Sequence, residues 1–248
     1  MDVSSRQKTS EQVLFIEEVQ RAAEKAMEEV ISYFRSSKNP NSEEAHAIID
    51  RVLEQAGCES PEGHIVAGGI QSAAPHEKGG GLLKRDEPIV IDIYPRSRTS
   101  GYFADMTRTV CLAKPAVQLQ KMFDAVLGAQ ELAISMIKPG VQCQKIQEAV
   151  ENFFSEAGFL TSGKVDKKGE FPFTEGFVHS VGHGVGQSIH EAPRIGRKSS
   201  DVLMEGDVLA IEPGLYYKAI GGVRIEDMLL VTNNGFRNLT NFSKEYIL

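Results

Sequence analysis

The same succession of segments occurs twice along this chain, and this repeat limits the folds that the chain can adopt. Apolar residues recur at steps of three and four over residues 10–36, which predicts an amphipathic helix. Thr9 and Gln12 have the spacing of a capping box at its start. Residues 43–56 form a second helical segment, which Gly57 is placed to end. Strand-like runs follow at residues 64–67, 89–94 and 102–112.

The second half of the chain repeats this order. Residues 115–137 form the next helical segment, and a shorter one runs to Ala157 with Gly158 as its cap. Two helices followed by strands in each half predict an α+β fold made from a duplicated α/β unit with pseudo-two-fold symmetry. We expect one domain over residues 1–248, with the polar stretch 163–176 as a surface loop. The strand-like runs of this half lie at residues 178–181, 208–210 and 224–232.

Composition and charge argue against several classes of protein. Of the 248 residues, 41% are hydrophobic and 25% are charged, which is the balance of a folded domain. The net charge of −7 argues against a nucleic-acid binder, which would present a clustered basic surface. The sequence has neither a signal-peptide core nor a run of about 18 apolar residues, so we expect a cytoplasmic protein that does not bind membranes. The spacing of Cys58, Cys111 and Cys143 predicts buried free thiols.

Four carboxylates stand inside apolar, strand-like runs. They are Asp92 in PIVIDIY, Asp105 in GYFADMTRTV, Glu212 in VLAIEPGLY and Glu226 in GGVRIEDMLLV. A buried carboxylate is costly unless it is paired or binds a metal. Any one of the four, taken alone, is best explained by a salt bridge or by a strand end that faces water. Four of them in one chain favour a shared site.

The spacing of these carboxylates follows the repeat. Asp92 and Asp105 are 13 positions apart, and Glu212 and Glu226 are 14 positions apart. Asp92 precedes Glu212 by 120 positions, and Asp105 precedes Glu226 by 121. Each half of the duplicated unit therefore delivers one acidic pair, and pseudo-symmetry would bring the two pairs face to face. Four converging carboxylates repel one another strongly, and two divalent cations would offset that charge.

A cluster of histidines is the third element of this pattern. A lone histidine is more often a structural residue than a ligand, but three within twelve residues are harder to explain in that way. The interleaved glycines permit a close backbone approach and unusual dihedral angles. Carboxylates with imidazole, and without thiolate, suit Mn²⁺, Co²⁺, Fe²⁺ or Zn²⁺ rather than a structural zinc cage. The cluster contains His179, Gly182, His183, Gly184, Gly186 and His190.

Together these strings resemble a known family. DIYPRSRTSGYFADMTRT, HSVGHGVGQSIHEAP, AIEPGLY and GVRIED are similar to the signature of the pita-bread metallopeptidases, the group of aminopeptidase P, prolidase and methionine aminopeptidase. The resemblance covers essentially the whole chain and implies the pita-bread fold. It implies two divalent metal ions bridged by Asp105 and Glu226, with Mn²⁺ or Co²⁺ favoured over Zn²⁺ or Fe²⁺. The implied metal ligands are Asp92, Asp105, His183, Glu212 and Glu226.

Residues outside the ligand set indicate the branch of the family. His179 and Arg224 resemble residues of the proline peptidases, where they would bind substrate, and methionine aminopeptidases generally lack both. By the same resemblance, His76 and His190 would flank the substrate and act in catalysis. Two plainer interpretations stay open. His76 could be an exposed loop residue, and Arg224 could be a partner for Asp227.

The activity that the resemblance implies is hydrolysis of an Xaa-Pro bond in a peptide or dipeptide. A hydroxide between the two ions would attack the carbonyl, and Glu212 would carry the proton. Tyr102, Phe177 and Tyr216 are candidates for the apolar pocket wall. A methionine-aminopeptidase-like enzyme, a non-peptidase C–N hydrolase and a metal-free binding module are the alternatives, and the five intact ligands disfavour the last. A homodimer also stays open.

Three features depart from the family pattern. Asp92 and Asp105 lie two positions further apart than is usual, with PRSRTS in the turn. Two extra residues preserve the alternation of a strand, so we expect both carboxylates to face the same side. Ile93-Tyr94-Pro95 also replaces the familiar glycine after the first aspartate. Proline peptidases of this group normally carry an N-terminal domain, and we expect this chain to be the catalytic domain without one.

Overall fold

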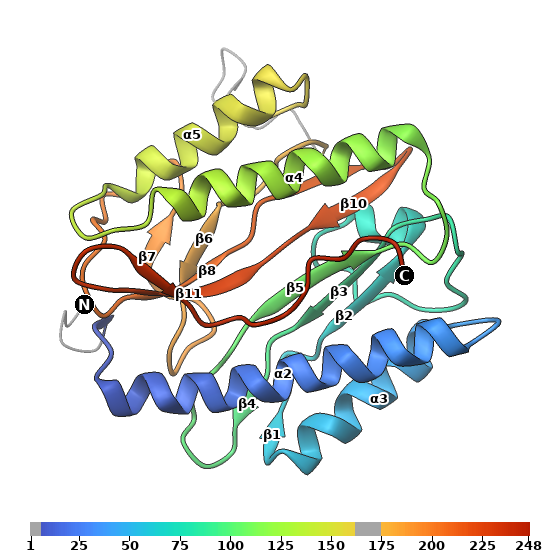
Figure 1. The fold of residues 1–248 in the computed structure, drawn as a ribbon, viewed down its shortest axis with the longest axis horizontal. Helices are drawn as coiled ribbons and strands as arrows, with labels where there is room; N and C mark the ends of the chain where they lie inside the picture. Colours follow the sequence, from blue (N-terminus) through green and yellow to red (C-terminus); the bar gives the residue numbers. More distant parts are fainter. Residues whose placement is uncertain (1–5, 162–174) are drawn as a thin grey trace.

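Two pairs of helices flank the strands of this chain in the computed structural model, which describes residues 6–161 and 175–248 (Figure 1). The capping box predicted at the first helix is confirmed, because the side chains of Thr9 and Gln12 each accept a hydrogen bond from the other residue's backbone amide. Gly57 and Gly158 follow the two helix pairs with φ of 70° and 86°, a left-handed conformation that ends a helix. The helices are α2 (Ser10–Ser36), α3 (Ser42–Gln55), α4 (Val117–Ser135) and α5 (Cys143–Glu156).

The strands of the first half form a small antiparallel sheet in the order β2-β3-β5. These strands are β2 (Ile65–Gly68), β3 (Ile89–Ile93) and β5 (Met106–Val110). The short strand β1 (Cys58–Glu59) pairs with β4 (Arg96–Ser97), which lies in the turn between β3 and β5. The 3-10 helix η1 (Gly69–Ala73) follows β2.

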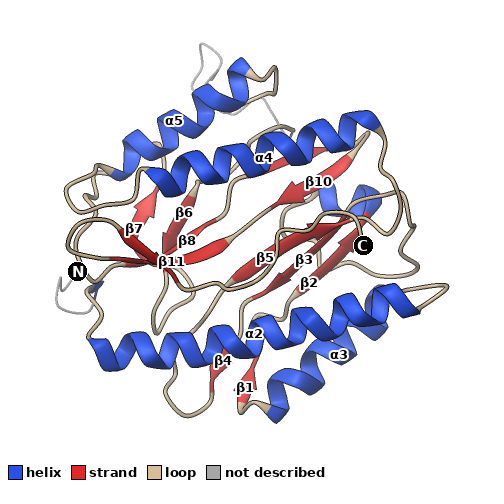
Figure 2. Cartoon of the chain, viewed as in Figure 1, coloured by secondary structure: helices blue, strands red, loops and turns tan. Residues whose placement is uncertain are grey.

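The strands of the second half form a larger antiparallel sheet in the order β12-β11-β8-β6-β7. Its members are β6 (Gly182–Gly184), β7 (Glu191–Ile195), β8 (Val208–Ile211), β11 (Asp227–Val231) and β12 (Phe236–Asn238). A separate hairpin joins β9 (Gly214–Tyr217) to β10 (Gly221–Arg224). The Glu226 amide donates a 3.1 Å hydrogen bond to the Thr107 carbonyl, so the strands of the two halves meet beside β5 and β11 (Figure 2).

Among the described residues, two large hydrophobic cores lie against these sheets, one for each helix pair. Strand β8 contributes side chains to both cores, because successive side chains of a strand point to opposite faces. Val208 and Ala210 belong to the core of α2 and α3, whereas Leu209 and Ile211 belong to the core of α4 and α5. Full burial of an aliphatic side chain contributes about 1.5–3 kcal/mol, so this sharing makes the two halves one body. The duplicated α+β architecture predicted from the repeat is confirmed.

The positions of two predicted strands were wrong. The run at residues 178–181 is not a strand; the strand begins at Gly182 and carries His183. The run at residues 224–232 is broken, because β10 ends at Arg224 and β11 begins at Asp227. In both places the apolar pattern predicted a strand close to the right residues but did not predict the residue at which backbone pairing starts. The predicted loop at 163–176 lies almost entirely outside the described residues.

Gly182 and Gly184 explain why the histidine-bearing strand is rich in glycine. A Cβ at Gly182 would lie 2.0 Å from the Ala210 carbonyl oxygen, and one at Gly184 would lie 2.3 Å from that of Ala192. The close backbone approach expected of these glycines is therefore confirmed. The unusual dihedral angles are not, since neither glycine nor Gly186 has a positive φ.

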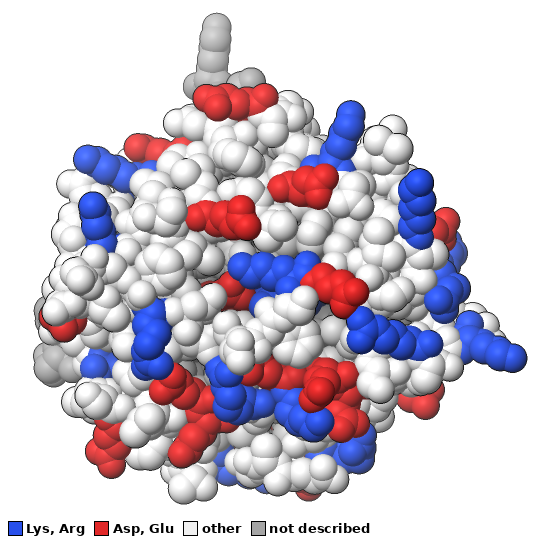
Figure 3. Space-filling view, viewed as in Figure 1, with Lys and Arg blue, Asp and Glu red and all other residues white. Residues whose placement is uncertain are grey.

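The surface charge, the apolar character of the helices and the state of the cysteines were each predicted from the sequence. On the face shown in Figure 3, the acidic and basic side chains of the described residues are interspersed rather than gathered into one basic stripe. Within residues 6–161 and 175–248, no helix is both long and apolar enough to cross a membrane. The three cysteines, Cys58, Cys111 and Cys143, are buried free thiols, as predicted.

Candidate metal centre

All the residues predicted as metal ligands, catalytic groups or polar substrate contacts line one pocket of about 320 Å³. The strands bring them there from both halves of the chain. Asp92 lies on β3, Asp105 directly precedes β5 and His183 lies on β6. Glu212 directly follows β8, and Glu226 directly precedes β11. The predicted residues in the lining are His76, Asp92, Asp105, His179, His183, His190, Glu212, Arg224 and Glu226.

The oxygen and nitrogen atoms of these side chains are close enough to share an ion. One ligand atom each from Asp105, His183 and Glu226 lies within 4.8 Å of the others. His183 Nε2 is 3.7 Å from Asp105 Oδ2 and 3.6 Å from Glu212 Oε1, which is longer than a hydrogen bond. His183 Nδ1 lies 3.2 Å from the Gly184 carbonyl oxygen, so a proton on Nδ1 leaves the Nε2 lone pair facing the carboxylates.

The charges of the cluster favour a cation. Burial, followed by the charge of Asp92, raises the pKa of Glu226 to about 8. Burial, and then the charge of Glu226, raises the pKa of Asp105 and of Glu212 well above the ordinary value. Burial lowers the pKa of His183 to about 3, so this imidazole is neutral and available as a ligand at pH 7. Divalent cations would relieve the repulsion that raises the carboxylate pKa values.

The two carboxylate oxygens of Asp92 differ in their hydrogen bonding. Its Oδ2 accepts a 2.7 Å hydrogen bond from Arg224 Nη2, but its Oδ1 is buried and has no partner among the described residues. A buried carboxylate oxygen without a donor costs free energy, and a metal ion would satisfy it. The donor set of four carboxylates and one imidazole therefore fits divalent metal ions of the Mn²⁺, Co²⁺, Fe²⁺ or Zn²⁺ type.

Arg224 begins a chain of hydrogen bonds along one wall of the pocket. Its Nη1 donates to the Tyr216 hydroxyl at 2.8 Å, and this hydroxyl lies 2.9 Å from His179 Nε2. His179 Nδ1 lies 2.8 Å from the Ser180 carbonyl oxygen, so both ring nitrogens already have partners. Arg224 pairs with Asp92 rather than Asp227, and the alternative partner considered for it is therefore wrong. The geometry gives Arg224 and His179 a role in holding the wall of the site.

His76 and His190 occupy a different position from His179. Both are exposed at the pocket lining, where a substrate could reach them. Burial lowers the pKa of His190, so its ring is neutral at pH 7. The His190 ring packs edge-on against the His183 ring, with 4.4 Å between the ring centroids. The prediction that His76 and His190 flank the substrate is compatible with these positions.

The pocket also contains residues that the sequence reasoning missed. Arg194 is exposed at the lining, donates to Ser180 Oγ at 3.2 Å and has no ion pair with a described residue. Tyr94, two residues after Asp92 in the sequence, also lines the pocket. Its hydroxyl accepts a 2.7 Å hydrogen bond from Lys78. The available signals were the arginine in HEAPRIG and the tyrosine in place of the familiar glycine.

The apolar part of the pocket lining differs from the prediction. Ile65, Tyr94 and Ile189 line the pocket, whereas Tyr102 and Phe177 are buried in the two hydrophobic cores. Tyr216 acts from behind the lining through its hydroxyl. Aromatic content alone did not reveal which rings face the cavity, because that depends on how the two halves pack.

Comparisons with known proteins agree with this geometry. The model of a family described as metallopeptidase family M24 matches residues 15–233. An Xaa-Pro dipeptidase of Pyrococcus horikoshii is 34% identical over 242 residues, which cover 97% of this chain and 64% of that protein. An uncharacterized peptidase of Bacillus subtilis is 32% identical over the same length and with the same coverage. The chain thus spans 64% of the length of these curated relatives.

Solved structures show the same likeness. The prolidase from Pyrococcus horikoshii has a TM-score of 0.87 and 32% identity, and the match covers 99% of this chain and 66% of that one. The X-Pro aminopeptidase from Thermotoga maritima has a TM-score of 0.86 and 28% identity, with 99% and 65% covered. These likenesses confirm the predicted pita-bread fold.

Proposed function

The chain belongs to metallopeptidase family M24, and we propose that it is a dinuclear-metal exopeptidase that hydrolyses the bond before proline. The observation that carries the proposal is the convergence of four carboxylates and a neutral imidazole, two carboxylates from each half, in one pocket. An interaction module would have no use for so costly a cluster. We propose that Asp92, Asp105, His183, Glu212 and Glu226 are the ligands, and that residues 1–248 form one catalytic domain.

The side chains of this pocket divide the work of hydrolysis. When bound, two divalent ions would supply a hydroxide between them as nucleophile and would polarise the scissile carbonyl. Glu212 is half-buried at the pocket lining, where it would be placed to transfer a proton to the departing proline nitrogen. His190 and His76 would donate hydrogen bonds to the substrate backbone and to the developing tetrahedral oxygen. Arg224 and His179 would keep this side of the pocket in place.

Arg194 favours a dipeptide as the substrate. It presents a cation at the pocket lining that forms no ion pair with a described carboxylate, although its charge acts on Glu212. The carboxylate at the C-terminus of a dipeptide lies one residue beyond the scissile bond, within reach of such a guanidinium, and the pair would be charge-assisted. A longer peptide would place an uncharged amide there. We therefore propose Xaa-Pro dipeptides ahead of longer Xaa-Pro peptides.

One screen tests the proposal. Purified protein is loaded with Mn²⁺, Co²⁺ or Zn²⁺ and given Xaa-Pro dipeptides, Xaa-Pro tripeptides and Met-Ala peptides, with a chelator-treated sample as the control. We expect hydrolysis of the Xaa-Pro substrates, loss of it on chelation, and close to two metal equivalents per chain at saturation. Full activity at one equivalent would exclude the dinuclear mechanism. Bound metal without cleavage of any peptide would favour a non-peptidase C–N hydrolase.

A further inference from the structure

Arg108 lies on the side of β5 that faces away from the pocket, yet it contacts the backbone of a proposed metal ligand. The side chain of its neighbour Thr107 lies on the side of Glu226, a residue of the pocket lining, and Thr107 Oγ1 donates a 2.7 Å hydrogen bond to Glu226 Oε2. Because side chains alternate along a strand, Arg108 points the opposite way. It is only 2% exposed, and it is the largest of the fully buried side chains in the described part of the chain. A buried guanidinium has to satisfy its charge and its donors inside the protein.

All five N–H groups of Arg108 have partners. Nη1 donates to the carbonyl oxygens of Thr107 at 2.9 Å and of Glu226 at 2.6 Å. Nη2 donates to Asp227 Oδ1 at 2.8 Å and to the Phe242 carbonyl at 3.0 Å, and Nε donates to the Ser243 carbonyl at 2.9 Å. One planar group thus joins β5, the residue Glu226 and the end of the chain.

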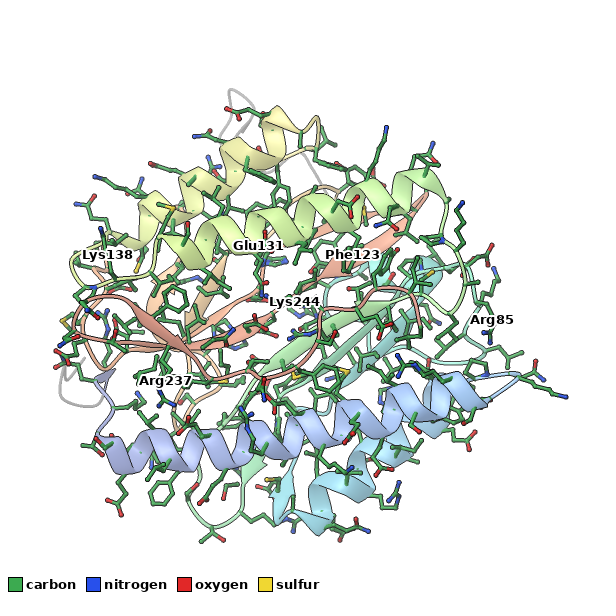
Figure 4. The ribbon with its side chains drawn as sticks, viewed as in Figure 1. Arg85, Phe123, Glu131, Lys138, Arg237 and Lys244 are labelled. Carbon is green, nitrogen blue, oxygen red and sulfur yellow. The ribbon has the colours of Figure 1, made fainter. Side chains whose placement is uncertain are left out.

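The end of the chain forms a strap, residues 239–248, that crosses between α4 and α2 (Figure 4). Lys244, which Figure 4 labels on the strap, has its Nζ 2.7 Å from Asp227 Oδ2. The Tyr246 ring stacks on the Phe123 ring of α4, with 4.0 Å between centroids. Glu245 pairs with Arg35 of α2 at 2.7 Å on the surface. The strap is therefore tied both to the helices and to the back of the metal site.

Glu226 is held at three points by this arrangement. Its amide donates to the Thr107 carbonyl, its own carbonyl accepts from Arg108, and its Oε2 accepts from Thr107. Arg108 takes part in two of these three contacts. It donates to the Glu226 carbonyl, and it also donates to the Thr107 carbonyl that accepts the Glu226 amide. Displacing the strap would release two Arg108 donors and one Asp227 partner, and the guanidinium could then leave the Glu226 carbonyl.

We propose that the C-terminal strap, through Lys244, Asp227 and Arg108, positions Glu226 and so sets the affinity of the site for divalent cations. This inference rests on the proposed function, since it takes Glu226 to be a ligand. Arg108 is a positioning residue, because it does not line the pocket and would act through Glu226. Groups that orient a metal ligand from behind commonly change metal affinity by about 10–100-fold when they are replaced.

Lys244→Ala is the test variant, and Arg35→Ala is its matched control. Each removes one positive charge and one ion pair that ties the strap down, but only Lys244 leads to Asp227. The measurement is the Mn²⁺ dissociation constant by titration calorimetry, with the unfolding temperature of the metal-free proteins recorded alongside. Loss of a positive charge alone would tighten cation binding. If the strap positions Glu226, the effect on Mn²⁺ affinity is the opposite. Lys244→Ala should then weaken Mn²⁺ binding by about threefold to tenfold, and Arg35→Ala should not weaken it.

Arg108→Lys extends the test, since it keeps the charge but cannot make five hydrogen bonds. We expect it to weaken Mn²⁺ binding by about 10–100-fold. Should this buried variant fail to fold, Lys244→Ala decides the question, because Lys244 is partly exposed. Equal Mn²⁺ affinity in Lys244→Ala and Arg35→Ala would overturn this inference and leave the proposed function standing. Failure of the wild-type protein to bind any of Mn²⁺, Co²⁺, Fe²⁺ or Zn²⁺ would overturn the proposed function, and this inference with it.

Discussion

Arg224 Nη2 donates a 2.7 Å hydrogen bond to Asp92 Oδ2, and this contact joins the end of β10 to the middle of β3. The two residues are 132 positions apart in the chain and both are buried. The bond fixes one oxygen of Asp92 and leaves the other facing the pocket without a partner among the described residues. A residue expected to bind substrate therefore also orients a proposed metal ligand.

The first prediction follows from this pair. Arg224→Ala would leave Asp92 charged and unpaired, and breaking a buried ion pair typically costs about 3–5 kcal/mol. We expect a lower free energy of unfolding, reduced metal content and a reduced kcat. Denaturant unfolding and metal analysis of the same preparation are the measurements. A raised KM with normal stability and metal content would limit Arg224 to substrate recognition.

The second prediction separates the proposed ligands from the histidine at the pocket lining. Asp105→Ala or Glu226→Ala should abolish both metal binding and hydrolysis, because each would remove a proposed ligand from the group whose ligand atoms converge with that of His183. His190→Ala should keep metal content near normal and lower the rate by about 100-fold or more, the usual cost of removing one hydrogen-bond donor to a developing oxyanion. Metal analysis and initial rates decide it. Equal loss of metal in His190→Ala and Asp105→Ala would contradict this division.

The third prediction concerns pH. Without metal, the pKa of Glu226 is about 8 in the folded protein, against 4.5 as the ordinary value. Between these two pKa values the folded state holds a proton on Glu226 that the unfolded chain releases. The stability that comes from binding this proton is fully present below pH 4.5 and is lost as pH rises through 8. Metal ions displace the proton, so their affinity should rise with pH up to about 8. His183, with a pKa of about 3, does not titrate in this range.

Unfolding temperatures of the metal-free and Mn²⁺-loaded proteins at several pH values between 5.5 and 8.5 test this prediction. We expect the metal-free protein to lose stability as pH rises, and the difference between the two forms to widen. A difference that stays constant with pH would show that no proton is released when metal binds.

The fourth prediction concerns the residue after the scissile bond. Proline has no N–H donor and its φ is fixed near −65°, so an enzyme that accepts it must hold the chain through other groups. The exposed side chains of His76, His190 and Arg194 offer such groups. Ala-Pro or Met-Pro should therefore be cleaved faster than Met-Ala. The reverse order of kcat/KM would place the protein with the methionine aminopeptidases.

The fifth prediction tests the selection of dipeptides. Arg194→Ala should raise KM for an Xaa-Pro dipeptide by about tenfold or more, since it would remove a charge-assisted hydrogen bond. The same change should have little effect on an Xaa-Pro tripeptide with an amidated C-terminus. Lys218→Ala, a change at an exposed cation outside the pocket lining, serves as the control. A similar loss on both substrates would argue against carboxylate recognition.

The sequence alone determined the elements that depend on local periodicity. The helix predicted at residues 10–36 matches α2, because its apolar stripe, its capping box and its end all lie within that segment. The repeat also identified Asp92 and Glu212 as counterparts, since a carboxylate in an apolar run is unusual enough to be noticed without coordinates. The spacing of 13 positions was compatible with a common face, and both aspartates do line the pocket.

The tertiary structure decided what depends on distant partners. Residues 182–184 form a strand because β7 and β8 lie against their glycines, and nothing local in the segment specifies that pairing. Arg224 lies beside Asp227 in the sequence but pairs with Asp92, and Asp227 pairs with Arg108. The physical reason is that hydrogen-bond partners follow from the register and packing of segments, whereas periodicity reports only which face of each segment is buried.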